Sequence, residues 1–101
     1  MIEKRVIRAM LDQGFVGFPN HVGINFPEDT EYMYLIAGSR LFECEVDKRN
    51  FNGTCMLKVT NRRVQGYDDW VNSNYQENDV IRFNRIYDAQ GIVRVLIVQN
   101  N

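Results

Sequence analysis

Two stretches near the middle of the chain alternate between apolar and polar residues, and this alternation restricts the fold more than any other feature. The stretches span residues 40–47 and 54–60, and apolar residues occupy every second position in each. These residues are Phe42, Cys44, Val46, Cys55, Leu57 and Val59. Strict alternation is typical of β-strands that bury one face and expose the other. The sequence therefore predicts two half-buried strands here.

The six residues between these strands, 48–53, predict a hairpin loop, because Gly53 stands near its end. We expect Asp47 to pair with Thr54. That register places Glu45 opposite Met56 and Lys58 diagonal to Glu45 on the outer face, which modestly favours the pairing.

Other apolar runs predict further strands, and turn-forming residues separate them. Strands are expected at residues 22–26, 32–37, 79–86 and 92–98, with a turn or single helical turn at 27–31 and a hairpin turn at 88–91. The last strand is apolar on both faces, which is usual for a strand covered on both sides. Residues 67–73 predict a short helix with Trp70 and Val71 as its apolar contacts, and with Asp68 and Asp69 in its first turn.

The N-terminal part of the chain has two interpretations. Ile2, Val6 and Met10 recur at four-residue steps, which slightly favours a helix over residues 2–11 that Gly14 ends. Residues 5–10 equally suit a first strand. The density of turn formers in residues 12–23 then predicts a long loop, pinned to the core by its aromatic residues.

Length and composition indicate one domain over residues 1–101. The chain is 45% hydrophobic and 25% charged, which suits a packed core and not a disordered tail. Six to seven strands and one or two short helices in so short a chain predict a mainly β fold. We expect an open pseudobarrel, because rolling up a sheet removes exposed strand edges.

The rare residues argue against most enzymes and metal sites. The chain has one histidine, His21, and two cysteines, Cys44 and Cys55. Three ligands fall short of the usual structural zinc site, and no phosphate-binding glycine loop or nucleophile elbow occurs. Both cysteines sit at apolar strand positions, where a thiol acts as a small hydrophobe. We expect no cofactor, no metal, no catalytic residue and free buried thiols in a cytoplasmic protein.

No apolar run is long enough for a membrane span, and the first residues lack the apolar stretch of a secretory signal. Because the chain begins at Met1 and has no linker-like ends, we expect a free-standing protein rather than a piece of a larger nuclease.

Four stretches of the sequence resemble the B3-type DNA-binding pseudobarrel of plant transcription factors and of effector domains in some bacterial restriction endonucleases. They are residues 24–28, 35–42, 57–60 with 67–71, and 74–83. Within the last, Asn74-Tyr75 and Asn78-Asp79-Val80-Ile81-Arg82-Phe83 are similar to the family's Asn-Leu…Gly-Asp-Val-Val-x-Phe run. Asn78 replaces the usual glycine, and both residue types tolerate a left-handed turn. Glu28 stands where the family usually has lysine.

The resemblance implies non-catalytic binding of duplex DNA by two arms, which correspond here to residues 12–23 and 48–53. Charge supports the second arm, since residues 40–66 carry six Lys and Arg against three Asp and Glu, a net charge of +3 in a chain of net charge −1. Cations suit phosphates, and asparagines suit base edges. The candidate DNA-binding residues are Arg8, Gln13, Asn20, His21, Lys48, Arg49, Asn50, Asn52, Arg62 and Arg63.

Two alternatives to a duplex-binding module remain open, and an enzyme ranks last. One is an OB-type barrel that binds single strands, with Phe51, Tyr67 or Tyr75 as stacking platforms. The other is a small interaction or ligand-binding protein, which could be a homodimer. Its apolar pocket or subunit interface would be formed by Phe15, Phe18, Tyr32 and Tyr34.

Overall fold

Seven strands and two short helices make up the part of the chain described by the computed structural model, residues 1–19, 24–49 and 54–99. Their bounds are β1 Ile2–Arg5, α1 Arg8–Asp12, β2 Phe15–Pro19, β3 Tyr32–Ala37, β4 Arg40–Asp47, β5 Thr54–Val59, α2 Tyr67–Asn74, β6 Val80–Tyr87 and β7 Val93–Val98. The structure is 47% strand and 14% helix. The predicted mainly β fold with six to seven strands and one or two short helices is confirmed.

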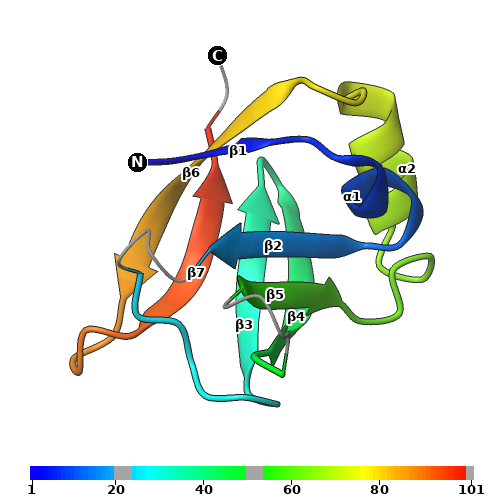
Figure 1. The fold of residues 1–101 in the computed structure, drawn as a ribbon. Helices are drawn as coiled ribbons and strands as arrows, with labels where there is room; N and C mark the ends of the chain where they lie inside the picture. Colours follow the sequence, from blue (N-terminus) through cyan, green and yellow to red (C-terminus); the bar gives the residue numbers. More distant parts are fainter. Residues whose placement is uncertain (20–23, 50–53, 100–101) are drawn as a thin grey trace.

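All seven strands belong to one sheet, in the order β1-β6-β7-β3-β4-β5-β2. Neighbouring strands are antiparallel except β3 and β7, which run parallel. The sheet curls into a nearly closed barrel, in which β2 and β5 cross in front of β3 and β4 (Figure 1). Both helices lie side by side at one end of this barrel.

The barrel interior is filled by the inward residues of the strands, as the alternation predicts. Phe18, Phe42 and Phe83 are each at most 1% exposed. Phe42 also contacts α2, with its ring centroid 5.5 Å from that of Tyr67 and 5.3 Å from that of Trp70. The Tyr67 hydroxyl donates a 2.9 Å hydrogen bond to the Met10 carbonyl, which ties α2 to α1.

Both cysteines are buried and free, as expected from their strand positions. Burial raises the pKa of the Cys44 thiol to about 12 and that of Cys55 to about 11. The thiolate form is therefore disfavoured at neutral pH, and both side chains serve as small core residues.

The predicted loop over residues 12–23 is wrong for Phe15–Pro19, which form β2 and pair with β5. Gly17 and Pro19 suggested a turn, but an edge strand tolerates both. Gly17 lies opposite Met56, where a Cβ atom would approach the Thr54 methyl group to 3.3 Å. The glycine therefore allows close strand contact rather than a turn.

The predicted strand over residues 22–26 is also wrong for its described part, because residues 24–26 are in no strand. This segment packs against the core without forming a strand. Phe26 packs on Phe18 with ring centroids 5.4 Å apart, and the Asn25 carbonyl accepts a hydrogen bond from Val93 N–H. Residues 22 and 23 lie outside the described residues.

The register of β4 and β5 differs by two residues from the predicted one. Asp47 pairs with Met56, and Glu45 lies directly opposite Lys58. Because side chains alternate with a period of two, this shift leaves the buried face unchanged. The connection between the two strands is residues 48–53 as predicted, but Thr54 and Cys55 at the start of β5 pair with β2 and not with β4.

At the N-terminus β1 covers residues 2–5 and α1 covers residues 8–12. The predicted helix over residues 2–11 is therefore right only for residues 8–11, and the alternative strand over residues 5–10 is wrong except at Arg5. The helix at 67–73, with Asp68 and Asp69 in its first turn, is confirmed as α2. Asn78 adopts a φ of 78°, the left-handed conformation expected of it. Among the described residues, no helix is long and apolar enough to cross a membrane.

Candidate functional site

The ten predicted DNA-binding residues fall into four groups. Asn20, His21, Asn50 and Asn52 lie outside the described residues. Lys48 and Arg49 follow β4. Arg8 begins α1. Gln13, Arg62 and Arg63 meet in one pocket.

Lys48 and Arg49 are engaged by their own neighbourhood. Arg49 Nε lies 3.3 Å from Asp47 Oδ1 and 3.9 Å from Asp29 Oδ2. Hydrogen bonds from the Arg49 backbone and side chain hold the pKa of Asp47 below its usual range. Lys48 Nζ donates a 3.1 Å hydrogen bond to the Phe26 carbonyl. The positive charges of Lys48 and Arg49 are therefore nearly balanced by the carboxylates of Asp29 and Asp47 at the start of the hairpin arm.

Arg8 also lies between carboxylates. Its guanidinium is 3.2 Å from Glu77 and 3.9 Å from Asp12, one turn along α1. The Arg8 side chain is 67% exposed, so these ion pairs stabilise the fold little. They do reduce the positive potential that Arg8 presents to an anion.

The pocket lies between the end of β5, the loop of residues 60–66 and the end of α1. It has a volume of about 510 Å³. Its lining residues are Gln13, Lys58, Val59, Asn61, Arg62, Arg63 and Val64. Three of these described residues are cationic, two are amides and none is acidic.

Local backbone geometry brings these residues together. Asn61 has a φ of 44°, which turns the chain out of β5. Gln65 then fixes the loop on β4, because its side chain accepts a 2.7 Å hydrogen bond from Glu43 N–H and donates to the Thr60 carbonyl. On the other side, Gly14 has a φ of 71°, and a Cβ atom there would lie 2.9 Å from Arg62 Cδ. The Arg62 side chain therefore passes the end of α1 next to Gly14, which has no Cβ atom to block it.

The three cations differ in how tightly they are held. Arg62 donates a 2.6 Å hydrogen bond to the Asp12 carbonyl, and its Nε lies 3.6 Å from Asp68. Lys58 faces Glu45 across the strand pair. Arg63 makes no ion pair with any residue that the structure describes.

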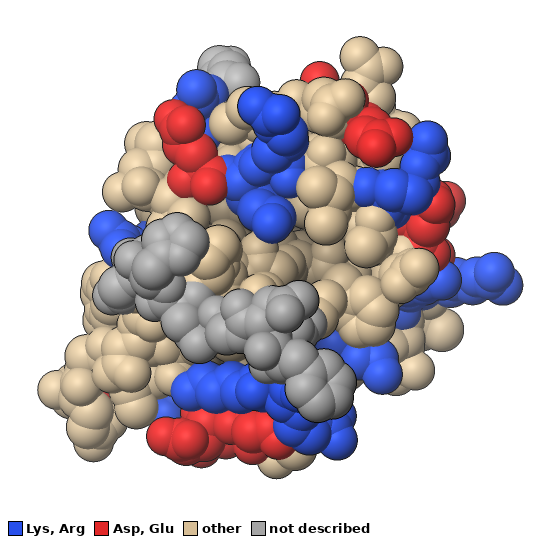
Figure 2. All heavy atoms as spheres, in the orientation of Figure 1, with Lys and Arg blue, Asp and Glu red and all other residues tan. Residues whose placement is uncertain are grey.

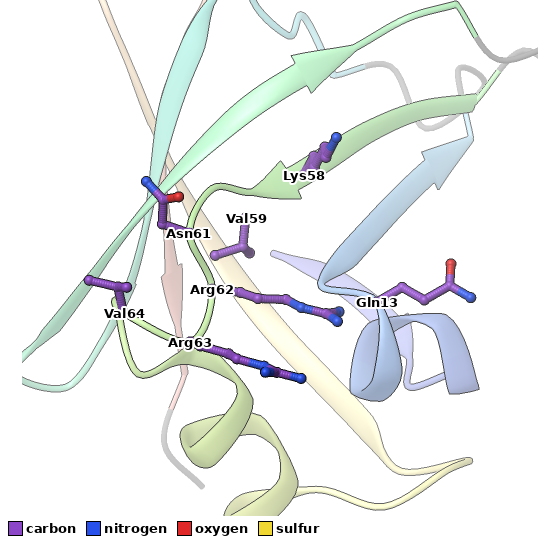
Figure 3. A pocket seen from close by; sticks show the side chains of 7 residues that line it. All are labelled: Gln13, Lys58, Val59, Asn61, Arg62, Arg63 and Val64. Atoms are coloured by element: carbon purple, nitrogen blue, oxygen red, sulfur yellow. The ribbon is translucent and has the colours of Figure 1, made fainter.

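Figure 3 shows Arg62 and Arg63 extending in the same direction, toward α1, with Lys58 apart from them on β5. Figure 2 shows one face of the molecule, where Lys and Arg are interleaved with Asp and Glu around a mainly uncharged hollow. The three cations that line the pocket are therefore a local basic cluster on a molecule whose surface carries both signs of charge.

The chemistry available in this pocket is anion binding. Guanidinium and ammonium groups bind phosphate oxygens, and amides add hydrogen bonds. Among residues 1–19, 24–49 and 54–99, no three His, Cys, Asp or Glu side chains are placed to hold a metal ion.

Sequence reasoning missed Lys58 and Asn61 as members of this site. Lys58 was assigned only to the outer face of a strand, yet that face leads to the pocket. The contact between Asp12 and Arg62 joins residues 50 positions apart, and no sequence pattern indicates it.

The sequence matches no known protein-family model and no curated protein sequence.

Proposed function

We propose that this protein is a non-catalytic DNA-binding module that holds duplex DNA by its backbone phosphates. The observation that carries the proposal is that Lys58, Arg62 and Arg63 line one pocket, in which none of the described lining residues is acidic. Arg63, free of described ion pairs, supplies the guanidinium most available to a phosphate. The resemblance to the B3-type pseudobarrel, which rests on sequence, points to the same activity.

The hairpin arm of residues 48–53 is a second contact in this proposal. Asp47 pairs with Met56, so Lys48 and Arg49 lie on the order of 13 Å along β5 from the pocket residue Lys58. One DNA strand advances by about 3.4 Å per nucleotide along the helix axis, so this distance corresponds to about four nucleotides of a duplex lying along β5. Arg49, 71% exposed, can exchange a carboxylate for a phosphate at little cost.

The single-strand alternative is weaker on the described residues. Tyr67 is 1% exposed and its hydroxyl is bonded to α1, so it offers no stacking platform. Tyr75 packs against Trp70 with ring centroids 5.7 Å apart. Phe51, the remaining platform, lies outside the described residues.

The free cysteines support the proposal of a cytoplasmic protein.

The test is fluorescence anisotropy with a short duplex between about 50 and about 200 mM salt. We expect the double variant Lys58→Ala/Arg63→Ala to bind at least about tenfold more weakly at low salt, because two phosphate contacts are lost. The slope of log affinity against log salt should fall by about 2.

The matched control is Arg82→Ala/Arg85→Ala, which removes two cations from β6. It changes net charge equally and leaves the pocket intact. Equal losses in the two double variants would reject the pocket as the DNA contact, and no duplex binding by the unaltered protein would reject the function.

A further inference from the structure

The outer face of the sheet over β4, β3, β7 and β6 is apolar, although its inner face already forms the core. Met33 and Leu35 of β3 point inward, and the alternating residues Tyr34 and Ile36 therefore point outward. On β7, Leu96 is buried while Val95 and Ile97 are only partly buried. The sequence therefore places large apolar residues on both faces of the two central strands.

The register joins these residues into one band across four strands. Ile36 pairs with Leu41 of β4 on one side and with Ile97 of β7 on the other. Tyr34 pairs with Val95, which pairs in turn with Ile86 of β6. We call this surface the outer apolar band. Its members are Tyr34, Ile36, Leu41, Ile86, Val95 and Ile97.

Water reaches much of this band. Leu41 is 57% exposed, Ile86 46% and Tyr34 39%, and Tyr32 beside the band is 50% exposed. The two helices lie elsewhere, since α2 packs on the inward residue Phe42 and on α1. Because β7 is apolar on both faces, the sequence predicts that another segment covers this outer face. None of the described segments does so.

The area of the band, together with its polar margin, is close to what contact with a second copy of the chain needs. A fully exposed tyrosine side chain has an accessible surface of about 200 Å², and an aliphatic side chain has somewhat less. Scaled by the exposed fractions of its residues, the band together with Tyr32 exposes on the order of 500 Å² of apolar surface. That is near the upper end for a single apolar patch on a monomer. With its polar margin added, it approaches the roughly 800 Å² per partner of a standard interface.

We propose that the outer apolar band is the interface of a homodimer. The band runs diagonally, from Leu41 on β4 to Ile86 on β6, and its two other corners are the polar residues Glu43 and Asn84. A two-fold axis along this diagonal lays the band on the same band of the second copy, as an isologous interface requires. Glu43 and Asn84 then remain at the margin, in water.

The test is sedimentation equilibrium without DNA, from about 5 to about 500 μM, the range for an interface at the small end of the usual sizes. We expect the mass to rise from the monomer's 11.9 kDa toward twice that value. Ile86→Glu should weaken association at least about tenfold, because a carboxylate would be buried between the two sheets.

The matched control is Ile7→Glu, the same change at a residue 44% exposed between β1 and α1, outside the band. It should leave association unchanged. The milder variant Leu41→Ser, with circular dichroism for each protein, separates lost association from lost folding.

A mass of 11.9 kDa at every concentration overturns the proposal. Equal effects of Ile86→Glu and Ile7→Glu overturn it too. The experiment contains no DNA, so its failure leaves the proposed phosphate contacts to their own test.

Discussion

At the scale of single residues, Gly14 is the position on which the candidate site most depends. Its φ of 71° is in the left-handed region, and Arg62 passes directly over it. Any side chain there strains the backbone and also meets Arg62. One glycine thus sets both the end of α1 and the path of a pocket cation.

We predict that Gly14→Ala weakens DNA binding as well as stability. The backbone strain should lower the free energy of unfolding by about 1–2 kcal/mol, measured by urea denaturation. The Cβ atom should also displace Arg62 and lower the DNA affinity severalfold, measured by anisotropy.

Gly91→Ala provides the control, because Gly91 has a similar φ of 78° but a Cβ atom added there would meet no described atom within 4 Å. It should cost similar stability and leave DNA binding unchanged. If both variants lose DNA affinity alike, Arg62 is not a DNA contact.

At the scale of elements, the turn between β6 and β7 is organised by one carboxylate. Asp88 accepts hydrogen bonds from Gln90 N–H at 2.8 Å and from Ile92 N–H at 3.0 Å, and Arg94 Nε donates to it at 2.9 Å. The Arg94 hydrogen bond, followed by those from the backbone, holds the pKa of Asp88 below its usual range.

This shift makes stability depend on pH in the acid range. The folded pKa of Asp88 is below its unfolded value of about 3.9, so its contribution is present above that value and is lost as pH falls through the folded pKa. We predict that Asp88→Asn lowers the melting temperature at pH 7, and that the difference from the unaltered protein shrinks below about pH 4. A difference that stays constant between these pH values would contradict the assignment.

The elements that could be predicted are those whose own residues determine them. Strands β4 and β5 alternate clearly, and α2 has its acidic first turn. Strand β2 could not be predicted, because Gly17 and Pro19 favour a turn locally and only pairing with β5 makes the strand stable. The register of β4 and β5 was missed for a related reason, since the chain beyond Thr54 pairs with β2 before it reaches β4.

At the scale of the whole molecule, the basic segment of residues 40–66 divides between two ends of β5. At one end, Asp29 and Asp47 neutralise Arg49. At the other end, the pocket has no acidic lining residue among those described. The residue types alone predicted that Arg62, Arg63 and Gln13 are candidate DNA-binding residues. That all three line the same pocket follows from the packing of α1 against the loop after β5. Such long-range contacts lie beyond sequence patterns.

In our proposal this pocket, and not the general surface charge, receives DNA. The most direct measurement is a titration of the ¹⁵N-labelled protein with duplex DNA, followed by amide chemical shifts. We predict that the largest shifts occur at Gln13, Lys58 and residues 61–64, with little change along β6. If the largest shifts occur over β6 and β7, with residues 61–64 unmoved, DNA does not bind at the pocket.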